Sequence, residues 1–324
     1  MTKTEDNYFC KVFSECDAVL APMAGVTDAA FRSICAEYGA KLMYTEMVSA
    51  KGMCYNNANT HFLLQIAPNE TETGVQIFGS DEHFLSEAVK RFLNESDFKF
   101  IDINMGCPVK KVTSNGEGSA LLADTKKLYS VAKAVKDASS KPVSAKIRTG
   151  TGGKISCIDN AKALEDAGMY MIAIHGRTKE MMYSGKADYE LIARTVECVD
   201  IPVIANGDVF CAEDYFKIKR ETKAAAVMVA RGAMGNPFIF REILSAQGGR
   251  TYAPPSEKER LDIALEHLSL LVKYKGEKIA CREFRKQLCW YTKGMTGGAK
   301  IRRHVAELET VSGIEEFIKS SFEN

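Results

Sequence analysis

Cys107 is the residue of this 324-residue chain whose setting best suits chemistry. It stands between Gly106 and Pro108 in the segment INMGCPVKKV, directly after an apolar run, and therefore in a loop rather than in a core helix. A thiol in an accessible loop can act as a nucleophile, a base or an acid, because its ordinary pKa of about 8.5 lets it release a proton at modest cost. A hydrolase of the Cys–His type, with His175 as its base, is one such chemistry.

Polar or charged side chains end seven of the eight short apolar runs in the first 231 residues. Solvent exposure accounts for single cases, but seven together indicate a ring around a ligand. The amide of Gln76 donates and accepts hydrogen bonds in one plane, which suits the edge of a heterocycle. Lys146 needs an anionic partner, because a buried unpaired ammonium is costly. A ligand would provide one, and so would a carboxylate such as Glu46. After Pro22 and Met23 on the first run, the ends are Glu46, Gln76, Asn104, Lys146, His175, Asn206 and Arg231.

Two glycine-containing segments follow the last two runs and suit a phosphate group. NGDV (206–209) and ARGAMGNPFIF (230–240) bring backbone N–H groups to loops of the kind that hold phosphate in barrels, and Arg231 adds a cationic fork. Glycines that merely permit tight turns are the alternative. A Cys–His hydrolase gives these loops no role, so it ranks below a phosphate-containing ligand.

The eight runs alternate with amphipathic stretches, and together these elements must position the ring. Continuous apolar strands alternating with helices are typical of a parallel sheet buried on both faces. Eight such units match an α/β fold of the (β/α)8 TIM-barrel type, in which chemistry lies at the carboxyl ends of the strands. An open doubly wound sheet is the alternative, but no G-x-G-x-x-G follows the first run. The predicted strands lie within 18–24, 41–47, 74–79, 100–105, 142–148, 171–176, 202–207 and 225–231.

A change of pattern at a Gly- and Pro-containing segment divides the chain into two domains. Apolar residues make up 46% and charged residues 26%, which is typical of a folded globular protein. The segment GGRTYAPPSEKER ends the alternating pattern, and only helical patterns follow it. We therefore predict a barrel domain in residues 1–247, a linker in 248–255 and an all-α domain in 256–324.

Cysteine spacing and hydropathy indicate the compartment. The ten cysteines include no C-x-x-C pair, so we predict reduced thiols and no metal centre. No apolar run approaches the roughly 18–20 residues that span a bilayer, and the beginning of the chain has no signal-peptide pattern. We expect a cytoplasmic protein that has no membrane contact and requires no protein partner.

The C-terminal part carries a concentration of basic residues. Between Lys273 and Arg303 there are ten Lys or Arg and two Glu, in a chain whose net charge is +1. Aromatic residues, among them Trp290, are interleaved with these charges. Basic side chains hold phosphates and aromatic rings stack on unpaired bases, so the pattern favours RNA, although a solvated basic helix face is the ordinary alternative. The candidate RNA contacts are Arg282, Arg285, Lys286, Lys293, Arg302 and Arg303.

Taken together, these segments resemble the tRNA-dihydrouridine synthase family, in its bacterial, FMN-dependent type. The resemblance runs from about residue 18 to 303, in the order of the family pattern. APMAGVTD and DINMGCP are its most specific motifs. The others are YTEMVSAKG, VQIFGS, AKIRTG, IHGRT, NGDV, ARGAMGNPFIF and REFRKQLCWYTKG.

The resemblance implies a barrel that binds FMN, reduction of the flavin by NADPH, and transfer of a hydride from flavin N5 to C6 of a uracil in tRNA. Cys107 would protonate C5, and Asn104 would hydrogen-bond the uracil. Lys146 would lie near the N1/C2 region of the flavin and stabilise its anionic reduced form. The other cofactor contacts would come from Pro22, Met23, Ala24, Gln76, His175, Asn206, Gly207, Asp208, Ala230 and Arg231.

Two other functions fit part of the pattern. An FMN barrel acting on free pyrimidines shares the fold and the hydride chemistry, yet needs no basic helical tail. An RNA-binding protein with an inactive barrel would not need the ring of polar strand ends or Cys107. A uridine in ribosomal RNA is an alternative target to one in tRNA.

Overall fold

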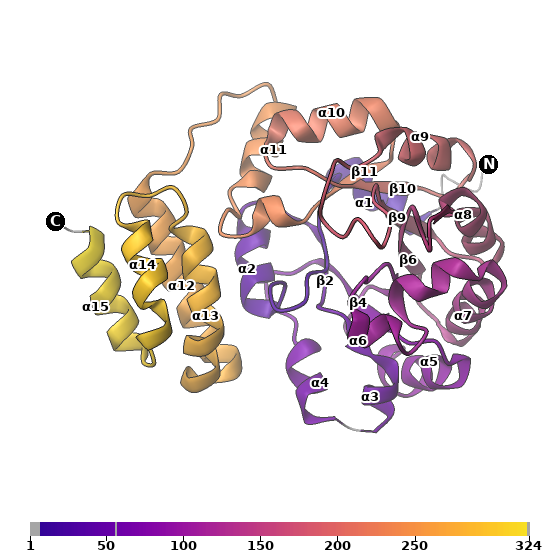
Figure 1. Ribbon diagram of the computed structural model, residues 1–324, viewed down its shortest axis with the longest axis horizontal. Helices are drawn as coiled ribbons and strands as arrows, with labels where there is room; N and C mark the ends of the chain where they lie inside the picture. The colour runs from indigo at the N-terminus through magenta and orange to yellow at the C-terminus, as the bar shows by residue number, and fades with distance from the viewer. Residues whose placement is uncertain (1–6, 56, 323–324) are drawn as a thin grey trace.

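The computed structural model describes residues 7–55 and 57–322 (Figure 1). Within them, eight parallel strands form a sheet in the order β1-β11-β10-β9-β6-β5-β4-β2, and β2 lies beside β1 at the seam. The predicted (β/α)8 barrel is therefore confirmed. Its strands are β1 (Ala18–Leu20), β2 (Leu42–Tyr44), β4 (Glu72–Phe78), β5 (Phe100–Met105), β6 (Val143–Arg148), β9 (Met171–His175), β10 (Val203–Asn206) and β11 (Ala226–Val229).

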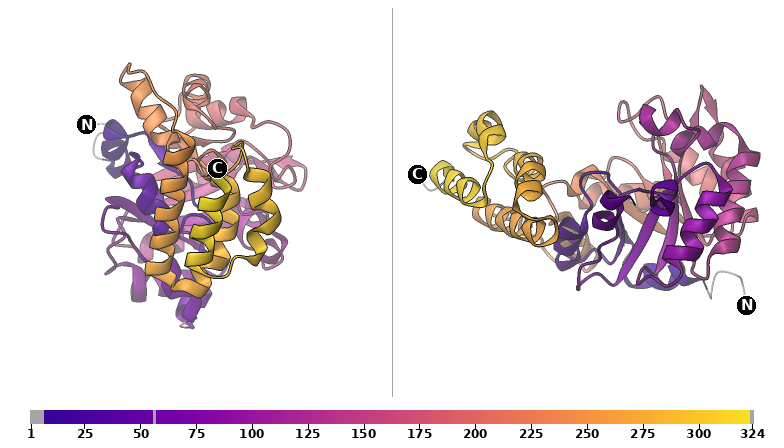
Figure 2. Two further views of the ribbon diagram at one scale, coloured as in Figure 1. Left: turned by 90° about the vertical axis from the view of Figure 1, so that its left-hand side faces the viewer. Right: turned by 90° about the horizontal axis from the view of Figure 1, so that it is seen from below.

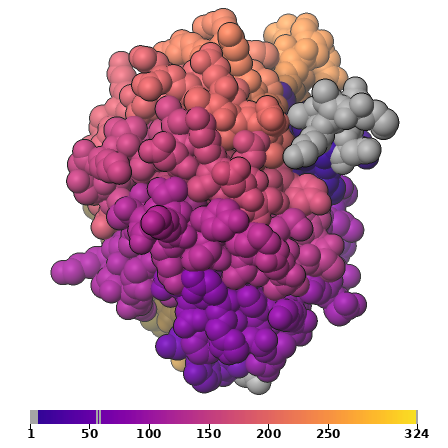
Figure 3. Space-filling view, turned by 90° about the vertical axis from the view of Figure 1, so that its right-hand side faces the viewer, coloured from indigo at the N-terminus to yellow at the C-terminus, as the bar shows by residue number. Residues whose placement is uncertain are grey.

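Helices cover the outside of the barrel, and several begin at an aspartate. Asp28, Asp81, Asp124 and Asp188 each accept hydrogen bonds from backbone N–H groups of the first turn, which helix ends otherwise leave unpaired. Figure 3 shows that the side of the barrel turned away from the C-terminal helices is a continuous convex surface. The covering helices are α2 (Ala29–Glu37), α5 (Glu82–Ala88), α7 (Thr125–Ala138), α8 (Cys157–Asp166), α9 (Tyr189–Glu197), α10 (Ala212–Thr222) and α11 (Ile239–Gln247).

Short elements decorate the strand ends. The glycine-rich segment after β6 forms a two-stranded antiparallel hairpin of β7 (Gly150–Thr151) and β8 (Lys154–Ile155). After β2 come β3 (Val48–Ser49), α3 (Ala50–Cys54) and α4 (Ala58–Leu63), and after β5 comes α6 (Lys110–Thr113).

Helix α1 (Tyr8–Glu15), which the sequence analysis did not predict, closes the amino-terminal end of the barrel. Its Phe9 is fully buried, and its ring lies 5.0 Å from the ring of Phe100, the first residue of β5. Phe9 and Val12 belong to the same buried cluster as the lumen residues Leu42 and Met171, which begin β2 and β9. The lumen is therefore packed with side chains at this end.

Four further helices stand to one side of the barrel (Figures 1 and 2). They are α12 (Glu257–Lys275), α13 (Glu277–Tyr291), α14 (Gly298–His304) and α15 (Val311–Phe322). Leu268, Phe284, Leu288 and Ile314 belong to a buried cluster that these helices share. α12 packs on α2, and Lys275 forms ion pairs with Asp28 at 2.6 Å and with Glu283 at 2.7 Å. Residues 248–255 lie between α11 and α12, and the division of the chain there remains a proposal.

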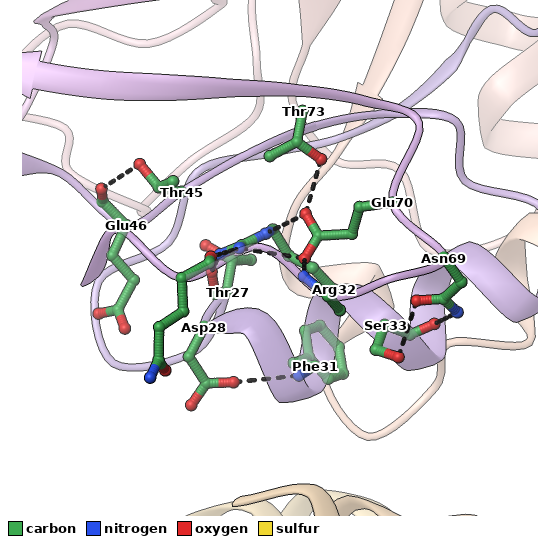
Figure 4. Close-up of polar contacts among 12 residues, drawn as sticks. Thr27, Asp28, Phe31, Arg32, Ser33, Thr45, Glu46, Asn69, Glu70 and Thr73 are labelled. Carbon is green, nitrogen blue, oxygen red and sulfur yellow. Dashed lines mark hydrogen bonds and ion pairs between the residues drawn. The ribbon is translucent and has the colours of Figure 1, made fainter. Parts of the chain in front are cut away.

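A buried ion pair supports the loop that follows β1 (Figure 4). Arg32 on α2 contacts both carboxylate oxygens of Glu70, at 2.8 and 3.1 Å, and both side chains are almost fully buried. Arg32 also donates to the carbonyl of Thr27, and the Thr27 hydroxyl accepts from the N–H of Met23. Thr73 donates to Glu70 at 2.6 Å. The pair thus ties α2 to the segments before β4 and after β1.

Replacing Arg32 by methionine is expected to lower the free energy of unfolding by about 3–5 kcal/mol, because it leaves the Glu70 carboxylate buried and unpaired. Urea denaturation followed by circular dichroism measures this change. The control is Lys133→Met, which removes the exposed pair with Asp137 and should barely move the transition. Equal effects of the two substitutions would mean that the buried ion pair contributes no more to the free energy of unfolding than the exposed pair does.

Candidate active site

A pocket of about 410 Å³ opens at the carboxyl ends of the barrel strands. Its walls include all twelve residues predicted to bind the cofactor or to be catalytic, together with Asn104 and Lys286. Ligand pockets of globular proteins have volumes of a few hundred Å³ or more, so the size is ordinary for a small-molecule site. The twelve are Pro22, Met23, Ala24, Gln76, Cys107, Lys146, His175, Asn206, Gly207, Asp208, Ala230 and Arg231.

The alternation of strand side chains explains why these residues converge. Successive residues of a strand point to opposite faces, so every second residue of each strand faces the lumen. Apolar residues fill the lower lumen, and polar residues take over near the strand ends. The register places Asn104 beside Lys146 and Asn206 beside His175, all four near the carboxyl ends of their strands. Short strands thereby present amide, ammonium and imidazole groups to one space.

A chain of hydrogen bonds connects a buried carboxylate to the Cys107 loop. Asp102 accepts from Gln76 Nε2 at 2.7 Å, and Gln76 Oε1 accepts from Asn104 Nδ2 at 2.8 Å. Asn104 Oδ1 then accepts from the N–H groups of Cys107 at 2.9 Å and Gly106 at 3.2 Å. Asp102, which was not predicted from the sequence, lies inside the apolar run FIDINM and is fully buried.

Lys146 has one hydrogen-bond partner among the described residues, the side-chain oxygen of Asn206 at 3.3 Å. The alternative ion pair with Glu46 is wrong, because Glu46 lies outside the pocket and accepts from the N–H of Gly25 instead. Burial, followed by the charge of Arg148, lowers the pKa of Lys146 to about 8. The charge of the buried Asp102 opposes this shift, but the two side chains form no ion pair, so the Lys146 ammonium still favours a ligand that offers oxygen acceptors or negative charge.

The Cys107 thiol lies in the same pocket and is half-buried. Burial raises its pKa, although a backbone hydrogen bond and the charges of Arg148 and Lys146 oppose this effect. The thiol is therefore protonated at neutral pH and is suited to donate a proton. Its loop is fixed on a second side, because the Cys107 carbonyl accepts from the N–H of Ser119 at 3.0 Å and from its hydroxyl at 2.9 Å.

His175 is unsuited to act as a base for Cys107. Its Nε2 lies 3.3 Å from Nη1 of Arg177, and a guanidinium can only donate, so the imidazole is neutral and accepts at this nitrogen. Burial, and after it the charge of Lys146 and neighbouring arginines, holds the pKa of His175 well below its ordinary value. A Cys–His hydrolase needs an imidazole that takes the thiol proton, so this geometry argues against that alternative.

The loops after β10 and β11 form the cationic end of the pocket. Asp208 forms ion pairs with Arg177 at 2.8 Å and with Arg231 at 3.3 Å, so its carboxylate orients the two guanidinium groups. The two loops touch closely, because a side chain at Gly232 would come within 2.2 Å of the Val209 carbonyl. Glycine at this position is therefore required by packing. Arg177, which lies in the IHGRT motif, had no role assigned from the sequence.

A comparison with known proteins identifies the family to which this pocket belongs. A family model described as dihydrouridine synthase matches residues 19–324. The chain belongs to the dihydrouridine synthase family. It is 40% identical over 287 residues to a probable tRNA-dihydrouridine synthase of Treponema pallidum, covering 86% of this chain and 84% of that protein. It is 38% identical over 312 residues to tRNA-dihydrouridine synthase B of Vibrio vulnificus, covering 94% and 95%.

Solved structures support the fold of this dihydrouridine synthase family member. Histamine dehydrogenase from Rhizobium sp. 4-9 matches with a TM-score of 0.56 and 13% identity. The match covers 84% of this chain and 49% of that chain, and at this low identity it bears on the fold alone. Among the described helices, none is long and apolar enough to cross a membrane.

The rim of the pocket carries exposed apolar side chains that the sequence analysis did not single out. Val109, Met182, Tyr183 and Phe210 each expose about half of their surface and line the pocket mouth. The guanidinium of Arg231 lies 4.7 Å from the centre of the Tyr183 ring. Exposed aromatic rings beside cations offer stacking surfaces for flat ligands.

The basic residues of the C-terminal helices do not form one group. Lys286 on α13 reaches the pocket, and its ammonium lies 4.7 Å from the ring centre of Trp290. Arg285 is half-buried and donates to the carbonyl of Leu308 at 2.9 Å, so it also holds the helices together. The remaining four candidates are exposed and lie outside the pocket walls, namely Arg282, Lys293, Arg302 and Arg303.

Proposed function

We propose that this protein is a tRNA-dihydrouridine synthase that binds FMN, accepts electrons from NADPH and reduces specific uridines of tRNA to 5,6-dihydrouridine. The observation that carries the proposal is the presence in one pocket, at the strand ends, of the Cys107 thiol and of Lys146, a buried cation that forms one hydrogen bond, to the neutral Asn206, and no ion pair among the described residues. Family membership and the names of the relatives support the same reaction.

The residues present fit a flavin nucleotide. Pro22, Met23 and Ala24 provide a mostly apolar wall for a flat ring system, and Gln76 offers an amide edge. Lys146 would face the part of the cofactor that carries negative charge after reduction. Bound FMN supplies the hydride that the protein's own side chains cannot supply. At the cationic end, Arg231 would bind the phosphate together with the backbone around Asn206, Gly207 and Ala230, and His175 would lie against the cofactor.

Asp208 takes a role different from that of a direct phosphate contact. Its carboxylate would repel a phosphate, but it holds Arg231 and the buried Arg177 in place. We therefore assign Asp208 to the cofactor site through these arginines and through its backbone.

The protein's part in the reaction is to position the uracil and to deliver a proton. Asn104 lies near the end of β5 and Cys107 lies three residues later in the loop that follows, and both line the pocket, so one base can contact both. As C6 of the uracil receives a hydride, negative charge develops at C5 and O4, and Cys107 donates its proton to C5. A positioned general acid of this kind contributes roughly 10²–10⁴-fold to the rate.

Polynucleotide RNA is favoured over a free pyrimidine because the pocket is shared with the C-terminal helices. Lys286 enters the pocket wall from α13, and exposed basic residues continue from it over α13 and α14. A free base has no phosphates for these cations to bind, whereas tRNA has many. The uridine would have to leave its stack to enter the pocket.

The experiment that tests the proposal follows flavin absorbance without oxygen. The protein is purified with FMN, reduced with NADPH, and mixed either with unmodified tRNA or with free uracil or orotate. Reoxidation by tRNA alone is the expected result, and mapping of dihydrouridine in the product identifies the position. Reoxidation by the free bases alone would indicate an enzyme that acts on free pyrimidines. Reoxidation by ribosomal RNA fragments alone would indicate that ribosomal RNA, and not tRNA, is the substrate.

Replacing Lys286 by methionine is expected to raise the KM for tRNA about three- to tenfold and to reduce the salt dependence of binding by about one ion, because one phosphate contact is lost. Flavin reduction by NADPH should keep its rate. The control is Lys126→Met on α7, which removes the same charge from the outside of the barrel. If both variants bind tRNA equally well at moderate salt, Lys286 does not contact the RNA.

A further inference from the structure

Asp102 is a buried carboxylate to which the proposed reaction gives no role. It is fully buried beneath the pocket and is not part of the pocket walls. Its two oxygens accept from Ser144 Oγ at 2.6 Å and from Gln76 Nε2 at 2.7 Å. Burial raises its pKa to about 6, while the two hydrogen bonds and the charge of Lys146 oppose this effect. Because both oxygens accept hydrogen bonds, the arrangement stabilises the carboxylate form of Asp102.

An anion at this position dictates the orientation of two amides. A carboxylate accepts hydrogen bonds and donates none, so Gln76 must turn its NH2 group toward Asp102. The Gln76 oxygen then faces Asn104, which must donate from its own NH2 group, at 2.8 Å. This leaves the Asn104 oxygen to accept from the N–H groups of Cys107 and Gly106. Turning either amide over would set two donors or two acceptors against each other.

The Cys107 loop depends on this chain of bonds for one of its two sides. Its carbonyl side is held by Arg148, which donates to the Gly106 carbonyl at 2.9 Å, and by Ser119. Its N–H side is held by Asn104 alone among the described residues. Buried polar networks are strong only while every member is satisfied, so the loss of the anchor affects the far end.

We infer that Asp102 is a positioning residue that holds the Cys107 loop in its place through Gln76 and Asn104. For its catalytic consequence this inference rests on the proposed function. The holding itself is a property of the folded chain and can be measured without RNA.

The first test measures the reactivity of the Cys107 thiol in the FMN-loaded protein. Asp102→Asn keeps the volume and one acceptor, but an amide can present either end to Gln76 and carries no charge. Alkylation by iodoacetamide is followed by peptide mass spectrometry from pH 6 upward until the rate at Cys107 reaches its plateau. We expect the plateau rate at Cys107 to rise about three- to tenfold, the factor that corresponds to one lost hydrogen bond. The thiols of Cys198 and Cys211 in the same samples should react at wild-type rates.

The pH profile separates positioning from a change of charge. A higher plateau reports a looser loop, whereas a shifted midpoint at an unchanged plateau reports an altered thiol pKa and would overturn the inference. An unchanged profile would overturn it as well. Ser144→Ala is the matched control, because it removes the other hydrogen bond of Asp102 and leaves the bond to Gln76 in place. Loss of the Ser144 bond raises the pKa of Asp102, so the control is compared on the plateau at high pH, where the carboxylate is ionised, and there it should react as the wild type does.

The second test asks whether Asp102 acts through Asn104. The rate of tRNA-dependent flavin reoxidation is measured for Asp102→Asn, Asn104→Ala and the double variant. If the residues form one chain, the double variant is no slower than Asn104→Ala alone. If the rate of the double variant instead falls by the product of the two single losses, Asp102 acts by another route and the inference is overturned.

The two tests distinguish a failure of this inference from a failure of the proposed function. If tRNA does not reoxidise the wild-type protein, the proposed function fails, and the alkylation rates still decide the role of Asp102. If Asp102→Asn folds poorly, Gln76→Met interrupts the same chain beyond the carboxylate and carries the same expectation for Cys107.

Discussion

Cys107→Ala is expected to bind FMN and to be reduced by NADPH at the wild-type rate, yet to be reoxidised by tRNA about 10²–10⁴-fold more slowly, the contribution of a positioned general acid. The physical reason is that the uracil C5 then gains negative charge with no proton donor beside it. Burial raises the pKa of the Cys107 thiol, which keeps the donor protonated at neutral pH. Anaerobic stopped-flow absorbance measures both half-reactions on the same sample.

The control for this prediction is Cys198→Ala, which removes a thiol at the end of α9, outside the pocket walls. It should reduce tRNA at the wild-type rate. Cys107→Ser tests the proton itself, since a hydroxyl fits the space but is a far weaker acid than a thiol. If Cys107→Ala reduces tRNA as fast as the wild type, another group supplies the proton.

Lys146→Met is expected to slow flavin reduction by NADPH about 10²–10³-fold, the usual cost of removing one preorganised group that stabilises developing charge. Lys146 would stabilise the negative charge that the cofactor acquires when it accepts electrons. Among the described residues Asn206 is its one hydrogen-bond partner, so its charge is directed toward the pocket. Stopped-flow reduction with NADPH measures the effect.

The same residue predicts a pH dependence. Burial lowers the pKa of Lys146 to about 8, so the ammonium is present below that pH and is lost above it. Flavin reduction should therefore be fastest below pH 8 and should fall as the pH rises through the Lys146 pKa. A bound anion would move this step upward, because it favours the charged ammonium. Lys146→Arg keeps its charge at every pH in the range and should show no such step, and a step that persists in Lys146→Arg would belong to another group.

The barrel was predictable because a strand buried on both faces reads as a continuous apolar run, and each of the eight runs overlaps a strand, although β4 begins two residues before its run. Helix α1 was missed because its apolar residues, such as Phe9 and Phe13, stand in a short segment next to polar residues. Nothing local in YFCKVFSE indicates that it closes a lumen built from residues far along the chain.

The site was predictable where polar residues end apolar runs, as Lys146 and Asn206 do. Asp102 was not, because within FIDINM it looks like one polar interruption of a strand, and its importance depends on partners 26 and 42 residues away. Lys286 was predicted as an RNA contact, but its place in the pocket wall follows from how α13 packs beside the barrel. Such long-range neighbours have no signature in local sequence.

The aromatic closure formed by α1 has a kinetic consequence. With Phe9 packed against Phe100 at the far end of the lumen, the described residues leave the pocket mouth as the route to the cofactor site. NADPH and the uridine would then have to enter through the same pocket mouth, one after the other. We therefore expect the enzyme to alternate between two half-reactions and excess NADPH to compete with tRNA for the opening.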